Sequence, residues 1–421
     1  MTIRRTAQLV DLDEAVAAIA DGSRIYVAQT SGTPLGLLAA IDERRGSFTD
    51  LEFISAYLLS RPAPLDHLGE PFRWKSLQPS APFRDVLDHP AFGIVPARYS
   101  DLDGITSPGG PLAADVLIAQ ASPPDADGRM SLGTSVGGNV NLLRSAPLVI
   151  VQINSRMPFV HGDGECHVSQ IDFMVEIDEP LAEMAPAKLD PISAAIAQHV
   201  SPFIIDGATL QFGIGAVPDA VLSSLGDRHN LGLHGGIIND ACIDLVESGV
   251  VTNTHKGVDE GISVGAEVMG TTRVYEWVDH NPLVKLVRGS YSHGIPGMAS
   301  INNFIALQST VEVALDGSAN SEFAVGRYIS GPGGAPDFAF GASVTTGGRA
   351  IMALPSTAAK GKISKIVRQV GPGAPTTLPS YVADVVVTEF GAVELRGKSL
   401  KERAELLTSI AHPDHRSSLS G

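Results

Sequence analysis

The sequence predicts an α/β protein built of two open α/β domains with mainly parallel sheets. Strand-sized apolar segments alternate with amphipathic helical segments from the amino terminus onward, which is typical of a parallel sheet with crossover helices. The 421 residues exceed what one hydrophobic core usually holds. A segment with three prolines at 178–192 interrupts the alternation, and the pattern then starts again. We therefore predict domains at 1–185 and 186–421.

The first predicted domain begins with a short amphipathic helix at 11–23, which we expect to end at Gly22. An apolar strand at 24–29 follows it. A turn through glycine and proline then leads into a second helix within 31–46. Further buried strands are expected at 51–58, 115–120 and 146–154.

The second predicted domain repeats this alternation. Ser399 and Glu402 form a capping-box pattern that opens its last helix, and the polar tail at 412–421 is expected to fray. The earlier helices are expected at 191–200, 218–226 and 240–249, and the strands at 208–213, 231–235 and 250–253.

Charge and cysteine content limit the possible partners and the compartment. The net charge of −16 argues against nucleic acid and anionic lipid, so an anionic ligand would need a local basic patch or backbone N–H groups. Cys166 and Cys242 have no metal-type spacing and indicate reduced thiols in a cytoplasmic protein. No apolar segment approaches the roughly 20 residues of a membrane span, and the amino terminus lacks the apolar core of a secretory signal.

Two glycine loops could bring a ligand close to the backbone. Gly213 and Gly215 stand between a predicted strand and a helix, whose amino end favours negative charge. The segment SGPGGAPDF places Gly331, Gly333 and Gly334 where their N–H groups could face an oxyanion. Plain tight turns explain either loop as well.

Two charged segments suggest further sites. Residues 358–369 hold Lys360, Lys362, Lys365 and Arg368 without an acidic residue, which indicates a phosphate site or a solvated face. The segment HGDGECH, at 161–167, could align its histidines and carboxylates on one face of a strand. Its two glycines favour a loop instead, so no metal site is predicted.

Two glycines follow His234 at the end of the predicted strand LGLHG, where open α/β sheets place their chemistry. This segment and its neighbours resemble, in one order, the acetyl-CoA hydrolase/transferase family of the class I coenzyme A-transferase superfamily. The likeness lies in 115–133, 152–181, 211–222, 231–240, 300–322, 328–342, 353–367 and 385–416.

The resemblance implies two α/β domains with a CoA thioester bound in the cleft between them, no prosthetic group, and a homodimer or larger homo-oligomer. In the family a glutamate attacks the thioester, forms an acyl–glutamyl anhydride and then carries CoA. His234 matches the histidine of the family's His-Thr-Glu motif, Gly235 the threonine and Gly236 the glutamate. The nucleophile position is thus vacant. The segment of the family that contacts CoA is matched by Ser356, Thr357 and Lys365. We expect the two glycine loops to contact CoA as well.

Three functions are compatible with this departure. We favour an enzyme that acts on an acyl-CoA without the glutamyl-CoA intermediate, by thioester or carbon–carbon hydrolysis, with His234 in the site. CoA transfer to a small carboxylate through a relocated carboxylate is the second, and a binding protein that senses acyl-CoA is the third. The carboxylates that could take part are Glu165, Asp163, Asp240 and Glu322. Cys242 and Glu389 are expected to be structural.

Overall fold

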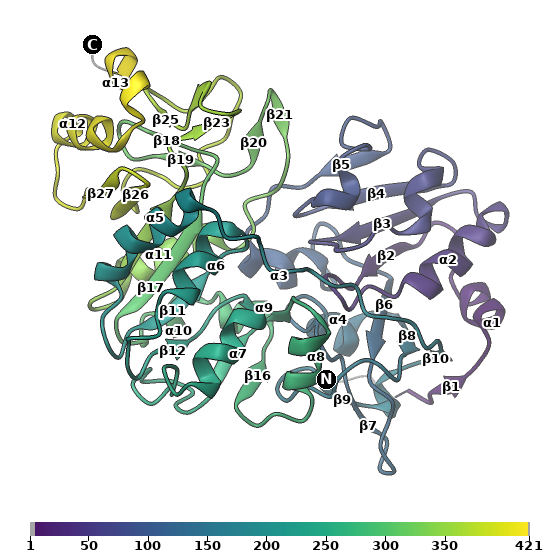
Figure 1. The fold of residues 1–421 in the computed structure, drawn as a ribbon. Coiled ribbons are helices and arrows are strands. Elements are labelled where there is room, and N and C mark those ends of the chain that lie inside the picture. The colour runs from purple at the N-terminus through teal and green to yellow at the C-terminus, as the bar shows by residue number, and fades with distance from the viewer. Residues whose placement is uncertain (1–4, 420–421) are drawn as a thin grey trace. The chain divides into compact units, whose positions relative to one another are not determined.

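A computed structural model describes residues 5–419, and the chain folds as two compact units (Figure 1). Residues up to Met184 together with Val264–Ser292 form the first unit. Ala185–Ser263 and the chain from His293 onward form the second. The expected boundary at 185/186 lies beside this division, whereas Val264–Ser292 packs with the first unit although the expected second domain contains it.

The first unit contains an eight-stranded sheet in which every neighbouring pair is parallel, as the sequence predicts. Its core is formed by side chains such as Phe53, Phe72 and Trp74, which are fully buried. In sheet order, the strands are β1 (Gln8–Leu9), β10 (Phe173–Glu176), β8 (Leu148–Ile153), β6 (Val116–Ala121), β2 (Arg24–Val27), β3 (Leu51–Ser55), β4 (Phe72–Ser76) and β5 (Phe92–Ile94).

Short helices accompany this sheet. The first helix ends at Ala17, five residues before the predicted Gly22, because the following residues form turns and Gly22 itself has a φ of +81°. The helices of this unit are α1 (Leu12–Ala17), α2 (Leu35–Glu43), α3 (Leu102–Thr106), α4 (Val140–Ser145), α8 (Thr272–Val278) and α9 (Gly289–Ser292).

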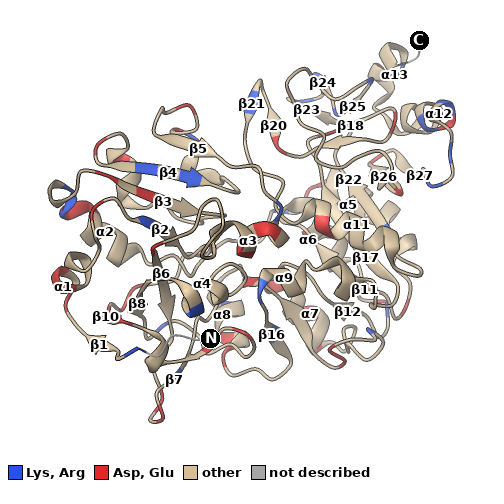
Figure 2. Cartoon of the chain, turned by 180° about the vertical axis from the view of Figure 1, so that it is seen from behind, with Lys and Arg blue, Asp and Glu red and all other residues tan. Residues whose placement is uncertain are grey.

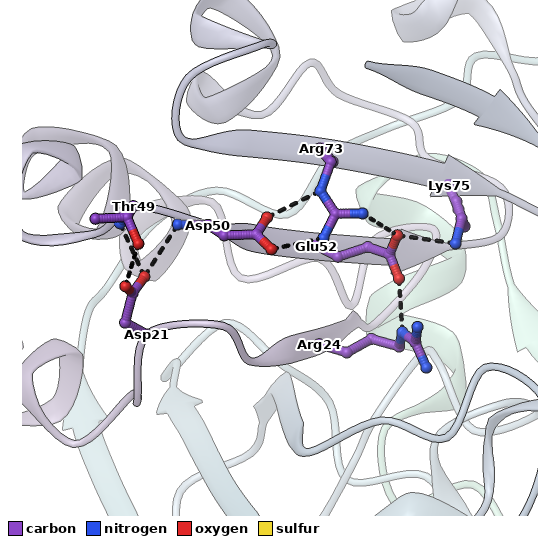
Figure 3. A network of polar contacts seen from close by, with 7 residues as sticks. All are labelled: Asp21, Arg24, Thr49, Asp50, Glu52, Arg73 and Lys75. Atoms are coloured by element: carbon purple, nitrogen blue, oxygen red, sulfur yellow. Dashed lines mark hydrogen bonds and ion pairs between the residues drawn. The ribbon is translucent and has the colours of Figure 1, made fainter. Parts of the chain in front are cut away.

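An ion-pair network joins β2, β3 and β4 near their amino ends (Figure 3). The buried carboxylate of Glu52 accepts from Arg24 at 2.6 Å, from Arg73 at 2.9 Å and from Lys75 at 2.8 Å. Burial tends to raise the pKa of Glu52, but Lys75 and Arg24 hold it below its usual range. Figure 2 shows the same arrangement as basic residues on β4 beside acidic ones on β3. Because the amino ends lie opposite the ligand-binding edge of a parallel sheet, we assign this network to stability.

The second unit contains a six-stranded sheet that is parallel except for its last strand. Its core includes Phe304, Phe338, Met352 and Val386. In sheet order, the strands are β12 (Gly232–Leu233), β11 (Thr209–Phe212), β17 (Phe304–Ser309), β22 (Arg349–Ala353), β26 (Val385–Thr388) and β27 (Gly391–Glu394).

The capping box of the last long helix is confirmed, since Ser399 and Glu402 exchange both expected hydrogen bonds. Two other predictions in this unit are wrong. Residues 250–253 form no named strand, only an isolated bridge to Leu231. The tail is also not frayed throughout, because Pro413 begins a further helix. The helices are α5 (Pro191–Val200), α6 (Ala216–Ser223), α7 (Asp240–Glu247), α10 (Ile295–Met298), α11 (Ala335–Val344), α12 (Leu400–Ile410) and α13 (Pro413–Leu419).

Candidate active site at the carboxyl edge of the second sheet

Most of the residues that the sequence marks as functional in the second unit follow parallel strands at their carboxyl ends. Gly213 comes directly after β11, His234 directly after β12, Ser356 shortly after β22, and Glu389 directly after β26. Since parallel strands end at the same edge, these segments share one edge of the sheet. That edge is where open α/β sheets bind ligands.

The order of the strands points to one position on this edge. The chain passes from β11 to β12 on one side and then returns to β17 on the other side of β11. Ligands in such sheets bind where the connections diverge in this way. Here the side-chain amide of Gln308 on β17 donates a hydrogen bond to that of Gln211 on β11.

The loop between β11 and α6 is open. Gly215 adopts a φ of +128°, which favours glycine, and caps the amino end of α6. A methyl carbon built on Gly215 would meet no atom within 4 Å, and one on Gly213 would meet only the Gln308 side chain and a backbone oxygen at 3.7 Å or more. The loop therefore leaves room for a ligand to approach the backbone.

His234 is held firmly at the end of β12. Its ring is 2% exposed and packs edge-on against Phe304, with ring centroids 6.4 Å apart. Its backbone N–H donates to Leu210 at 3.0 Å. The fully buried ammonium of Lys256 donates to the carbonyls of Leu233 at 2.8 Å and Ile262 at 2.6 Å, which fixes the strand end. The sequence analysis did not single out Lys256.

The two glycines after His234 differ in their surroundings. A methyl carbon on Gly235 would lie 3.1 Å from the Gln211 side chain. On Gly236 it would lie 3.3 Å from both Cε1 and Nε2 of His293, and 3.7 Å from Phe338. His293 is 3% exposed. The space that a side chain at position 236 would enter is therefore bordered by an imidazole edge.

His293 also contacts the second glycine loop. A methyl carbon on Gly334, at the amino end of α11, would lie 2.5 Å from Cδ2 and Nε2 of His293 and 2.9 Å from Phe338. The His293 and Phe338 rings pack with centroids 4.3 Å apart. The segment after His234 and the second glycine loop, which the sequence analysis singles out, therefore both contact His293. The sequence analysis did not single out His293 itself.

Replacing Gly334 with alanine is expected to destabilise the second unit, because the added methyl must displace the buried His293 and Phe338 rings. We expect a loss of about 1–3 kcal/mol in the free energy of unfolding, as for other overpacked sites. Urea denaturation of G334A and of the control G226A measures it, since a methyl on Gly226 meets no atom within 4 Å. Equal stability of the two variants would contradict the contact.

The rest of the second glycine loop adjoins a buried carboxylate. Gly333 has a φ of +54°, which favours glycine. The N–H groups of Ile329 and Ser330 donate to the backbone oxygen of Glu322. The Glu322 carboxylate accepts from Thr377 at 2.7 Å, and burial raises its pKa. Gly331 lies buried in the same loop.

Ser356 and Glu389 form a pair at the ends of β22 and β26. Ser356 donates to the Glu389 carboxylate through its backbone N–H at 2.8 Å and its hydroxyl at 2.6 Å. Burial lowers the pKa of Lys365, and the charge of Glu389 opposes that shift. Thr357 begins the short strand β23 (Thr357–Ala358). A role of Ser356, Thr357 and Lys365 in CoA binding stays a prediction.

Glu165 and Asp163 belong to the first unit. Glu165, on β9 (Glu165–His167), accepts from the N–H of Gly162 at 3.1 Å and lies 3.2 Å from Nδ1 of His161. Glu165 and His161 line an open pocket of about 490 Å³. Asp163 accepts from Arg288 at 3.1 Å. A catalytic role of Glu165 stays a prediction. Within residues 5–419, no cluster of three or more histidine, cysteine or acidic residues could hold a metal ion.

Glu267 is a buried carboxylate of the first unit that the sequence analysis did not consider. It accepts from Gln29 at 2.6 Å, Tyr99 at 2.7 Å, Thr30 at 3.0 Å and the N–H of Gly137 at 3.2 Å. Burial raises its pKa to about 7. Gln29 and Thr30 come shortly after β2, and the later strands β3 and β6 lie on opposite sides of β2 in the sheet. Ligands of open α/β sheets bind at such a point. The Glu267 cluster therefore occupies the same kind of position in the first sheet as the β11 loop does in the second.

The cysteines fit the structural role expected for Cys242. Both side chains are buried, and burial raises the pKa of each thiol to about 12. Neither thiol is a nucleophile at neutral pH. No helix within 5–419 has the length and apolar character that a membrane crossing requires.

Comparison with known proteins identifies the class. Residues 5–186 match the acetyl-CoA hydrolase/transferase N-terminal domain, and residues 270–421 match the C-terminal domain. The chain is 36% identical over 413 residues to a 4-hydroxybutyrate coenzyme A transferase of Clostridium kluyveri. The aligned region covers 98% of this chain and 96% of that protein.

Solved structures agree with this assignment. RipA from Yersinia pestis superposes with a TM-score of 0.94 at 33% identity, covering 98% of this chain and 96% of that one. A 4-hydroxybutyrate CoA-transferase of Porphyromonas gingivalis superposes with a TM-score of 0.82 at 28% identity, with the same coverage. The fold and the relatives define an enzyme of the class that acts on coenzyme A thioesters. The chain belongs to the acetyl-CoA hydrolase/transferase family.

Proposed function

We propose that the protein hydrolyses a CoA thioester, or a carbon–carbon bond of an acyl-CoA, without a glutamyl-CoA intermediate. The observation that carries this proposal is at Gly236, the position matched to the family's nucleophile. It has no side chain, and the edge of the His293 ring borders the space that one would enter. An imidazole can activate water but cannot carry CoA as a glutamyl thioester.

Two carboxylates of the second unit, Glu322 and Glu389, already accept hydrogen bonds from other side chains. Glu322 accepts from Thr377, and Glu389 accepts twice from Ser356. Binding of the CoA moiety is assigned to the open Gly213–Gly215 loop, to Gly331, Gly333 and Gly334, and to Ser356, Thr357 and Lys365. Backbone N–H groups and a lysine suit the phosphates of CoA in a chain of net charge −16.

CoA transfer to a small carboxylate is the second candidate. The names of the relatives favour it, since the Clostridium kluyveri protein is a coenzyme A transferase. Glu322 is a candidate to replace the nucleophile, because it is buried and its backbone oxygen accepts from Ile329 and Ser330, which lead into the Gly331–Gly334 loop.

The test is to incubate the protein with acetyl-, butyryl-, 4-hydroxybutyryl- and succinyl-CoA, with and without acetate as acceptor. Hydrolysis releases free CoA at a rate that acetate does not change. Borohydride treatment during turnover, followed by peptide mass spectrometry, should then find no reduced glutamate or aspartate. Formation of acetyl-CoA from the other thioesters that requires acetate, or a reduced carboxylate such as Glu322, would support transfer instead.

A further inference from the structure

One ring nitrogen of His293 borders the position that matches the family's nucleophile. Nε2 is the atom that lies near both Gly236, at 3.3 Å from an added methyl, and Gly334, at 2.5 Å. A larger residue at Gly334 would have to displace the ring, and one at Gly236 would require the ring to give way by a few tenths of an ångström. The two glycines therefore keep side chains away from Nε2 on both sides.

The remaining surroundings hold the ring in place. His293 is 3% exposed, and its ring packs against Phe338, which itself packs against Phe304 with centroids 6.4 Å apart. Phe304 is the first residue of β17, in the centre of the sheet, and packs against His234 as well. Rigid apolar support of this kind fixes the orientation of a catalytic side chain.

We propose that His293 is the general base of this enzyme and takes the place of the missing carboxylate nucleophile. The inference rests on the proposed hydrolysis. Gly236 matches the position from which the family's glutamate attacks the thioester carbon, and the Nε2 edge of His293 lies against that position.

The step balances without a further reactant. Nε2 accepts a proton from water as the water oxygen bonds to the thioester carbonyl carbon, which gives a tetrahedral oxyanion. The carbon–sulfur bond then breaks, and the imidazolium returns the proton to the leaving thiolate. The products are a carboxylic acid and free CoA. Backbone N–H groups of the Gly331–Gly334 loop are suited to stabilise the oxyanion.

The experiment compares wild-type protein with H293A, H293Q and the control H229Q, whose histidine side chain is 75% exposed in the same unit. We expect kcat for acceptor-independent CoA release to fall by about 10²–10⁴-fold in both His293 variants, as for removal of a general base. KM should change only a few-fold. Added imidazole should restore part of the rate of H293A, a readout that a merely structural role would not move.

Two results would overturn the inference. One is a kcat for H293Q within about threefold of wild type, far less than the loss of a base produces. The other is a loss of activity that imidazole does not restore and that accompanies a lowered unfolding temperature in both variants. If wild-type protein releases no CoA without an acceptor, the proposed function fails first. If wild type and both variants hydrolyse equally, only the role of His293 fails.

Discussion

Placing a glutamate at position 236 will not by itself create a CoA-transferase. The Cβ atom of G236E would lie 3.3 Å from Cε1 and Nε2 of His293, closer than most side chains approach one another. Phe338 lies 3.7 Å away, so the rest of the glutamate must also pass aromatic rings. We expect the new carboxylate to be displaced from the attacking position by the ring that now occupies its surroundings.

Removing the ring should release this block. We expect the double variant G236E/H293A to transfer CoA from an acyl-CoA to acetate with a kcat/KM about 100-fold above that of G236E alone, because a displacement of about 1 Å costs a reaction of this kind a similar factor. Mass spectrometry of the double variant, incubated with acyl-CoA, should find CoA bound to the residue at 236. Hydrolysis should be low in the double variant, which lacks the proposed base.

The matched control is G236Q/H293A, which has the same shape but no carboxylate and should transfer no CoA. Thermal unfolding of all three variants shows whether each is folded. Transfer by G236E at the rate of the double variant would show that His293 does not block the position. Failure of a folded double variant to form any covalent adduct would show that position 236 is not the nucleophile position.

Most of the fold was predictable because it depends on local patterns. The apolar segments at 24–29, 51–58 and 146–154 became β2, β3 and β8, and the capping box at Ser399 opened α12. Errors arose where tertiary contacts decide. Residues 250–253 are apolar enough for a strand but pair only through Leu231 and Val251.

The site was only partly predictable. The glycine loops and His234 could be placed at strand ends, since a glycine-rich segment after an apolar run is a local signal. His293 and Glu267 lie in segments without a motif, and they acquire meaning only through neighbours far away in the chain. Gly334 is 41 residues from His293 in sequence, and Gln29 is 238 residues from Glu267. A histidine between Ser292 and Gly294 gave no periodic signal.

Removal of the Glu267 side chain should cost the first unit much of its stability. E267A would deprive the buried donors of Gln29, Thr30 and Tyr99 of this acceptor, while the N–H of Gly137 still donates to the backbone oxygen of Ala266. A buried donor left unsatisfied costs roughly 1–3 kcal/mol, and the groups partly re-pair, so we expect a loss of about 3–5 kcal/mol. Urea denaturation of E267A measures this loss. A change below about 0.5 kcal/mol, the value of a typical surface substitution, would contradict the structure.

The same residue should give stability a particular dependence on pH. The pKa of Glu267 is raised from 4.5 to about 7 in the folded protein, so between these values the folded state holds a proton that the unfolded state has lost. The stabilisation by this proton is full below about pH 4.5 and is lost as pH rises through 7. A pKa shift of this size corresponds to a contribution of about 3 kcal/mol to the free energy of unfolding.

E267Q isolates this dependence, because its amide keeps an acceptor oxygen and does not titrate. Between pH 5 and pH 8, the free energy of unfolding of wild type should fall by about 2–3 kcal/mol relative to that of E267Q. The control E276Q removes an exposed carboxylate of the same unit and should follow wild type at both pH values. Parallel curves for wild type and E267Q would mean that Glu267 is charged throughout, because its hydrogen-bond donors then outweigh its burial.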